Sequence, residues 1–370
     1  MSKFTKLNWL FYEITAKINS TQQQLMNRNT KRQWHVIMCI AIAFICISAI
    51  AFHNQALESK TTQSTHQITS IIYDGRTAYR LSDGRTEAVI VPEIGRVMRY
   101  GFVGSSNVLW NSTQKNFNKN EWRNWGGDKT WAAPQLWWSA MSGRDWPPDE
   151  VWDGSPHKAR ILSNGHLQTT SEVTSGMGAR TVREYWFEKN GDFTIQQTVE
   201  KVTGELLLLS IWNVTQIMSP DAIFVPLNPK SPYKQNFHWI TPVKNGSPVV
   251  YMTPTLLQLR PSIDNDYKIG ADSPVAALAA VKDGIAMVER SERPPGNYPD
   301  GAVGGGFPVE VYSQGDSKIA YSELELLSPL RLLKKGDRFE HIIHWSLHQL
   351  PSRDVNSQRT RVAVEKLLAS

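Results

Sequence analysis

From Ser70 to about Leu350 the sequence consists of short runs in which apolar and polar residues alternate, and turn signals separate the runs. Alternation with a period of two places one set of side chains on each face of a β-strand. Asp74-Gly75 and Asp83-Gly84 are hairpin signals that divide TSIIY, TAYRL and TEAVIVP into three strands. About fifteen such runs over about 280 residues predict one large antiparallel β-structure rather than several small domains.

Further candidate strands follow along the chain, among them ELLLLSIWNVTQI (205–217), PVEVY (308–312), YSELELL (321–327) and FEHIIHWSL (339–347). Helical periodicity is clear only between Asp354 and Leu368. We therefore expect a β domain over residues 70–350 and a C-terminal helix or tail over residues 351–370.

An uncharged apolar run of seventeen residues extends from Val36 to Phe52. Its length falls between that of a transmembrane helix, roughly 17–25 residues, and that of a signal-peptide core, roughly 7–15. Residues 1–52 contain six basic side chains and one acidic one, which is +5 of the total net charge of +6. Because positive flanks stay in the cytoplasm, the remainder of the chain is expected outside it.

Two interpretations of this segment stay open. In the first, residues 1–33 are a basic cytoplasmic region, 34–52 a transmembrane signal anchor and 53–69 a linker, so the protein is single-pass with a periplasmic domain. In the second, translation starts at Met26 and a signal peptide is cleaved after Ala51, which gives a secreted protein.

The rest of the chain carries a net charge of about +1 by the same count. A domain with so little net positive charge gives no electrostatic reason to expect nucleic-acid binding. The two cysteines, Cys39 and Cys46, both lie in the apolar run, which excludes disulfides and Cys-ligated zinc from the β domain.

Eight of the fourteen tryptophans lie between Trp110 and Trp152, in a stretch interrupted by one glycine pair and by prolines. We interpret this stretch as a long loop, and indoles there suit the apolar C–H face of a pyranose ring. Sugar hydroxyls also need hydrogen-bonding partners. The candidate contacts are Trp125, Asp128, Lys129, Trp131 and Gln135. The alternatives are that the tryptophans are core residues and that Asp128 and Lys129 form an ion pair that locks the loop.

Several segments resemble a bacterial family of galactose-mutarotase-like domains, which is similar to the aldose epimerases and to glycoside-hydrolase-type carbohydrate-binding domains. These segments are TEAVIVPEIGRVMRYGF, NWGGDKTWAAPQ, WPPDEVWDG, NYPDGA and SELELLSPLRLLKKGD. The resemblance covers about residues 70–350 and implies an all-β supersandwich with a carbohydrate site on its concave face. It also implies that IWNVTQ (211–216), with Asn213, is the central strand, although the His-containing segment of the epimerases is missing there.

In YSELELL, alternation places Tyr321, Glu323 and Glu325 on one face of a strand. Two carboxylates two positions apart are close enough for their ionisation to couple, which suits general acid–base work. The resemblance implies a late glutamate as the general base, so Glu323 and Glu325 are the catalytic candidates. The alternative is a solvated strand face.

The Gly/Pro-rich segment 293–308 is expected to be a rim loop, with Tyr298 and Asp300 as candidate ligand contacts. His341, His344 and His348 do not share one face of a strand, so no metal site is predicted. No cofactor is predicted either.

Two hypotheses from different classes remain at this point. The protein is an exported carbohydrate-binding module, or it is a mutarotase-like aldose epimerase with a glutamate base.

The basic flank and the apolar run make a prediction about topology. A reporter that is active only in the cytoplasm, fused after Ser370, should be silent, and a periplasm-active reporter at the same position should report. Cytoplasmic reporter activity would show that the β domain stays inside.

Overall fold

The computed structural model describes residues 67–114, 121–262, 264–301, 305–316 and 318–369 of the chain. The predicted cytoplasmic region, the anchor or signal segment 34–52 and most of the linker lie outside these residues. Among the described residues, none of the helices has the length and apolarity needed to cross a bilayer.

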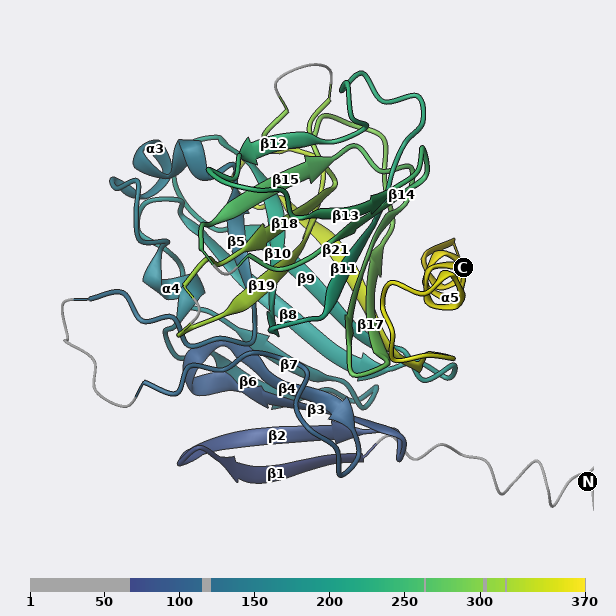
Figure 1. Cartoon of the computed structure of the whole chain (residues 1–370). Helices are drawn as coiled ribbons and strands as arrows, with labels where there is room; N and C mark the ends of the chain where they lie inside the picture. Colours follow the sequence, from purple (N-terminus) through teal and green to yellow (C-terminus); the bar gives the residue numbers. More distant parts are fainter. Residues whose placement is uncertain (1–66, 115–120, 263, 302–304, 317, 370) are drawn as a thin grey trace, which may run out of the picture. The chain divides into compact units, whose positions relative to one another are not determined.

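Two antiparallel sheets make up the domain, and the first has eleven strands (Figure 1). In Figure 1 it runs from β1 at the bottom, through β10 and β19, to β12 at the top. Its strands, in spatial order, are β1 (Gln67–Tyr73), β2 (Arg76–Ser82), β3 (Thr86–Val91), β4 (Arg96–Phe102), β5 (Asp128–Ala133), β10 (Leu207–Met218), β19 (Tyr321–Leu327), β18 (Val309–Ser313), β15 (Tyr267–Ala271) and β12 (His238–Thr241), with β20 (Arg331–Leu333) paired to the start of β10.

The second sheet has ten strands and packs against the first. Its strands, in spatial order, are β13 (Val249–Met252), β14 (Leu256–Leu259), β11 (Ala222–Pro226), β16 (Ala276–Lys282), β17 (Ile285–Ser291), β21 (Arg338–Gln349), β9 (Phe193–Lys201), β8 (Ala179–Phe187), β7 (Leu167–Thr170) and β6 (Lys158–Ile161). The prediction of an all-β sandwich is confirmed.

The core lies between the sheets and follows from strand alternation. On β19, Leu324 and Leu326 face inward and belong to the same apolar cluster as Ile343 and Trp345 of β21, all fully buried. This large apolar cluster supplies the main driving force for folding.

The hairpin signals have their predicted role. β1 and β2 join at Asp74-Gly75, where both residues have positive φ (48° and 76°), as a two-residue hairpin requires. β1 begins at Gln67, inside the segment predicted to be a linker, because its residues pair with β2 throughout.

The interpretation of the tryptophan-rich stretch as one continuous loop is wrong for residues 128–133, which form β5 in the middle of the first sheet. All six residues are buried, so the strand shows no alternation of polar and apolar residues. Gly126 and Gly127 immediately precede β5, and both have positive φ, a conformation that favours glycine. A Cβ atom at Gly127 would lie 2.2 Å from the carbonyl oxygen of Val97.

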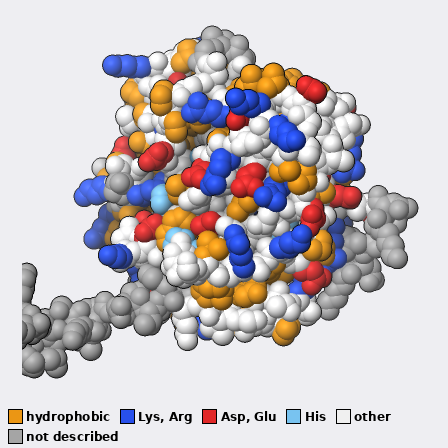
Figure 2. Space-filling view, turned by 180° about the vertical axis from the view of Figure 1, so that it is seen from behind, with side chains coloured by type: hydrophobic (Ala, Val, Ile, Leu, Met, Phe, Trp, Pro, Cys, Tyr) orange, Lys and Arg blue, Asp and Glu red, His pale blue; other side chains and the backbone are white. Residues whose placement is uncertain are grey.

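Helices are short and peripheral. The 3₁₀ turn η2 (Gln135–Trp137), α3 (Trp138–Ser142) and α4 (Glu150–Asp153) lie beside β5, and a further 3₁₀ turn, η1 (Pro92–Ile94), joins β3 to β4. The predicted C-terminal helix is confirmed as α5 (Gln358–Ala369), which packs Val364 and Leu368 against the outer face of the second sheet. Seen from behind, basic, acidic and apolar side chains are interleaved on the surface (Figure 2).

Candidate functional site

The outer face of the first sheet, opposite to the core, brings together side chains from five strands. The register aligns Lys129 on β5 with Val214 on β10, then with Glu325 on β19 and Glu310 on β18. Gly270 on β15 completes this row, and the neighbouring row contains Glu323. The predicted alternation of β19 is therefore confirmed: its glutamates face away from the core.

Lys268 on β15 joins two of these carboxylates. Its Nζ lies 2.7 Å from Glu310 Oε2 and 2.8 Å from Glu325 Oε2. The indole Nε1 of Trp212 donates to the same oxygen of Glu325 at 2.9 Å, and the ammonium lies 4.3 Å from the centre of that indole ring. Glu325 is thus held from two sides.

Glu323 has a different partner. Lys129 donates to its Oε1 at 3.2 Å, and Gln216 Nε2 donates to the same oxygen at 2.8 Å. We call the set Lys129, Lys268, Glu310, Glu323 and Glu325 the carboxylate–lysine cluster.

Burial controls the ionisation of this cluster. Burial raises the pKa of Glu310 well above its ordinary value, and it raises the pKa of Glu325, although Lys268 opposes both shifts. Burial acts to lower the pKa of Lys268, but the charges of Glu310 and Glu325 outweigh it and the pKa is raised. Lys129 is fully buried and its pKa is lowered by burial. Carboxyl groups outnumber ammonium groups in this cluster, so a proton held by the Glu310–Glu325 pair would reduce the excess negative charge.

Five indoles pack beside the cluster and are called the tryptophan cluster: Trp122, Trp131, Trp138, Trp146 and Trp212. Trp131 is central, edge-on to Trp138 at 5.6 Å and to Trp212 at 5.3 Å between ring centroids. The ammonium of Lys129 lies 4.5 Å from the Trp131 ring centroid, so the two clusters are contiguous.

The carboxylate of Asp153, at the end of α4, orients this cluster. Its Oδ1 accepts from Trp131 Nε1 at 2.7 Å and from Arg96 Nη2 at 2.6 Å. Its Oδ2 accepts from Trp122 Nε1 at 2.6 Å. One acidic side chain thereby fixes two indoles and a fully buried guanidinium.

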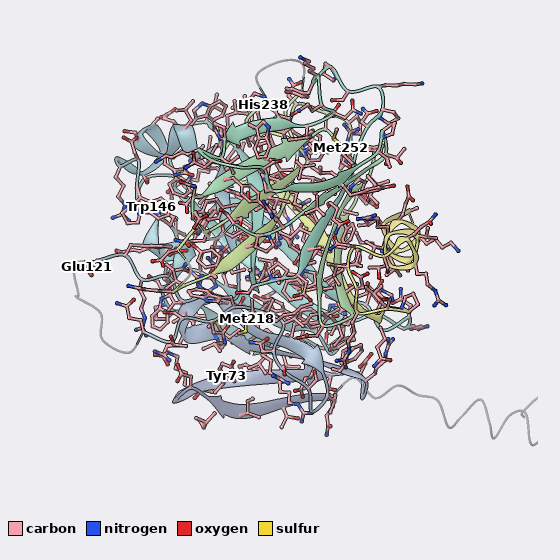
Figure 3. The ribbon with its side chains drawn as sticks, viewed as in Figure 1. Tyr73, Glu121, Trp146, Met218, His238 and Met252 are labelled. Atoms are coloured by element: carbon pink, nitrogen blue, oxygen red, sulfur yellow. The ribbon has the colours of Figure 1, made fainter. Side chains whose placement is uncertain are left out.

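Trp146 is the exposed member of the cluster. It lies in the segment between α3 and α4 (Figure 3), stacks on Trp138 at 6.0 Å and 19°, and is 48% exposed. Trp131, Trp138 and Trp212 are all 5% exposed or less. Trp146 therefore presents an indole to solvent at the edge of the buried clusters.

The prediction of Trp131 as a ligand contact in a loop needs correction. Its side chain is part of the core of β5, so Trp131→Ala should cost about 3–5 kcal/mol of stability, as for other buried tryptophans, and it cannot report on binding alone.

Asp128 and Asn213 face the other sheet. Asp128 pairs with Arg183 of β8 and accepts from Thr215 Oγ1 at 3.0 Å. Asn213 accepts from Gln197 Nε2 at 2.9 Å. Both side chains are fully buried between the sheets and cannot contact a ligand that lies over Glu325.

The alternative of an Asp128–Lys129 ion pair is also wrong. Consecutive residues of a strand point to opposite faces, and each of the two finds a partner of its own there.

Two further predicted contacts lie elsewhere. Trp125 packs against the apolar cluster of β3 and β4, and it lines a separate cleft of about 560 Å³ with Arg76 and Arg123. Gln135 is exposed on η2.

Residues 293–301 and 305–308 fold over the outer face. Phe307 packs directly on Gly270, where a Cβ atom would lie 2.1 Å from its ring. Burial raises the pKa of Asp300 next to Lys268 and Glu310, so Asp300 does join the cluster. Tyr298 is buried and donates to the carbonyl of Pro294 at 2.7 Å.

Sequence reasoning missed Trp212, Lys268, Glu310, Trp146 and Asp153 as site residues. Applying the alternation of β19 to its neighbour PVEVY (308–312) would have found Glu310. The strand β12, whose His238 lies opposite Gly270 (Figure 3), was not predicted either. Within the described ranges, histidine and carboxylate side chains form no group that could hold a metal ion.

Comparison with known proteins gives the fold. No family model and no curated protein sequence matches the chain. A proposed mutarotase from Salmonella typhimurium superposes with a TM-score of 0.50 and 9% identity over 80% of this chain and 99% of its own. A proposed aldose 1-epimerase from Escherichia coli K12 gives 0.50 and 12%, over 74% and 99%.

A TPR-domain-containing protein from Parabacteroides distasonis gives a TM-score of 0.48 and 13% identity over 76% of this chain, which spans 49% of that protein's length. The first two likenesses confirm the predicted galactose-mutarotase-like fold.

The pKa of Glu310 predicts a pH dependence of stability. Because it is raised in the folded state above the ordinary value of 4.5, the folded protein holds an extra proton above that pH, and this contribution to stability is lost as pH rises. Glu310→Gln should remove this loss, so the variant should gain stability relative to wild type from pH 5 to pH 8 in urea unfolding.

The exposed carboxylate Glu340 provides the control, since Glu340→Gln should follow the wild-type pH profile. Parallel curves for wild type and Glu310→Gln would contradict the assignment of a raised pKa.

Proposed function

We propose that this protein is an exported carbohydrate-binding protein of the galactose-mutarotase-like superfamily, which holds a saccharide on the outer face of its first sheet. The observation that carries the proposal is the half-exposed indole of Trp146, stacked on a buried tryptophan cluster that adjoins the carboxylate–lysine cluster.

The chemistry of the two clusters matches that of a sugar. The exposed indole suits the apolar C–H face of a pyranose ring. Within the carboxylate–lysine cluster, the side chains of Glu323 and Lys268 reach the surface, at 9% and 14% exposed, and can offer an acceptor and a donor to hydroxyl groups. Charged partners make the stronger hydrogen bonds. Asp153 holds the indoles in place before a ligand arrives, which reduces the entropy lost on binding.

The names of the solved structures support the superfamily assignment. Two proteins with this fold are a proposed mutarotase and a proposed aldose 1-epimerase. Export rests on the basic flank and the apolar run Val36–Phe52, and the reporter fusions described above test it.

Trp146→Ala tests the binding proposal. Loss of a sugar-stacking indole should cost on the order of 1–3 kcal/mol, by analogy with the burial of a large apolar side chain, or roughly 5- to 150-fold in affinity. Calorimetry with a panel of monosaccharides and short oligosaccharides measures the effect.

Trp186→Ala is the matched control, because this partly exposed indole stacks on His166 at 4.2 Å in the second sheet. Equal affinities of Trp146→Ala and wild type, or absence of saccharide binding by wild type, would refute the proposal.

A second candidate function is an aldose epimerase, favoured by the raised pKa of the adjacent carboxyl groups of Glu310 and Glu325. Mutarotation needs a base that takes the proton of the anomeric hydroxyl and an acid that protonates the ring oxygen. Of a carboxyl pair that shares one proton, one member can accept while the other donates.

Glu325→Gln separates the two functions. A glutamine still accepts and donates hydrogen bonds but cannot take the proton, so an epimerase should lose its acceleration of mutarotation, followed by polarimetry, while binding persists. Saturable binding by wild type without acceleration would leave the binding protein as the function.

A further inference from the structure

A cleft of about 310 Å³ opens between the two sheets, at the end of the sandwich where β10 finishes. This volume lies at the lower end of the range of small-molecule sites, about 300–1,000 Å³. Most of the side chains that line it are apolar and belong to the core between the sheets or pack against that core. The cleft is therefore a place where the apolar core is accessible from outside.

The wall formed by the second sheet is one continuous row. The register places Ala280 of β16 opposite Met287 of β17, and Met287 opposite Leu347 of β21. All three line the cleft and belong to the apolar cluster between the sheets. In the next row, Lys282 lies opposite Ile285, and both line the cleft as well. Because alternate residues of a strand share a face, Lys282 lies on the same side of β16 as Ala280, so the apolar row and the lysine form one surface.

The first sheet supplies the facing wall. Ile217 and Met218 at the end of β10 line it, together with Val108 from the segment between β4 and β5. The backbone N–H of Met218 donates to the carbonyl of Val108 at 3.1 Å, which holds these two residues side by side. Met218 (Figure 3) is 39% exposed, so its side chain lies at the mouth of the cleft.

The rim of the cleft carries charges of both signs. Lys282 Nζ donates to the backbone carbonyl of Ser219, the residue after β10, at 2.8 Å, which uses one of the three N–H donors of the ammonium group. Asp283 also lines the cleft and is exposed, and its backbone N–H donates to the carboxylate of Asp221 at 2.8 Å. A charged head group of either sign would meet a like charge here, whereas a hydroxyl group can accept from the ammonium and donate to a carboxylate.

We propose that this cleft binds an uncharged amphiphile, a long-chain alcohol, whose hydrocarbon chain lies between Met287 and Ile217 and whose hydroxyl accepts a hydrogen bond from Lys282 Nζ. Binding removes apolar surface of both the chain and the accessible core from water, which is the main source of affinity. The proposal is independent of the saccharide site, because the cleft lies on the core side of the first sheet and the carboxylate–lysine cluster lies on its outer face.

Titration calorimetry of the full chain with 1-butanol, 1-hexanol and 1-octanol tests the proposal. Saturable binding is expected, and each added methylene should tighten binding about fourfold, as burial of a CH₂ group does. Octanoate and octylammonium should bind more weakly than 1-octanol. Affinity that is independent of chain length, or tighter binding of either charged ligand, would overturn the assignment.

Met218→Ser should weaken the binding of 1-octanol by about three- to tenfold, because it removes part of the apolar wall. The position is partly exposed, so the variant should fold. Met252→Ser is the matched control, since Met252 is 47% exposed on β13 and lies outside the cleft. Wild-type affinity in Met218→Ser, or an equal loss in Met252→Ser, would contradict the proposal.

Ala280→Leu tests whether the cleft has room for a chain. The larger side chain should occupy this space, so binding of 1-octanol should be lost while the urea midpoint of unfolding stays at or above that of wild type. Ala279→Leu is the comparison, because Ala279 packs in the apolar cluster under α5 and a larger side chain there should lower the midpoint. Retained binding in Ala280→Leu, or a midpoint lowered as in Ala279→Leu, would show that the core has no such space.

Trp146→Ala should leave the binding of 1-octanol unchanged, which distinguishes failure at this cleft from failure at the saccharide site. The apolar run Val36–Phe52 is the same in every variant, so alcohol that associates with it contributes equally to all titrations.

Discussion

The candidate site depends on the bonds that the carboxylate of Asp153 forms. This carboxylate neutralises Arg96, a fully buried guanidinium that also donates to the backbone carbonyl of Gly126 at 2.8 Å. Removal of one member of such a buried pair leaves an uncompensated charge, which typically costs about 3–5 kcal/mol. The same carboxylate holds Trp122 and Trp131, so the stability of the fold and the geometry of the aromatic surface rest on one side chain. The segments around α4 belong to neither sheet. The bonds of Asp153 nevertheless hold the large side chains there in a fixed arrangement.

The central strands carry polar groups on both faces, which is unusual for strands buried this deeply. On the core side, Asp128, Thr215 and Arg183 form a connected network between the sheets. On the outer side, Lys129 and Glu323 belong to the site. Burial of these groups opposes folding unless each is hydrogen-bonded, and the apolar cluster around Trp345 and Leu324 supplies the compensating free energy. The site is thus built into the sandwich rather than added on loops, with Trp146 and residues 293–301 and 305–308 as its irregular parts.

Much of the fold could be predicted from local chemistry, and the limits have physical causes. The Asp-Gly turns and the alternation of YSELELL are local signals, and both predictions hold. β5 was missed because a strand buried on both faces has no alternation. Asn213 was predicted because the resemblance implied that IWNVTQ is the central strand. β10 is buried over most of its length, so its pattern does not show that Trp212 rather than Asn213 lies beside Glu325. Lys268 and Asp153 act through partners far away in sequence, and only the tertiary arrangement brings them together.

The adjacent charges of Asp128 and Lys129 have a consequence for how β5 finds its place during folding. A shift of the strand by one residue would exchange the two faces. A shift in one direction would place Lys129 against the guanidinium of Arg183, and a shift in the other direction would place Asp128 against the carboxylate of Glu323. Each of these contacts is between like charges in a dry environment, so either misalignment is penalised by one residue of the dipeptide. The apolar residues of β5 do not distinguish its two faces. The charges of Asp128 and Lys129 do, and they favour the observed alignment of the strand.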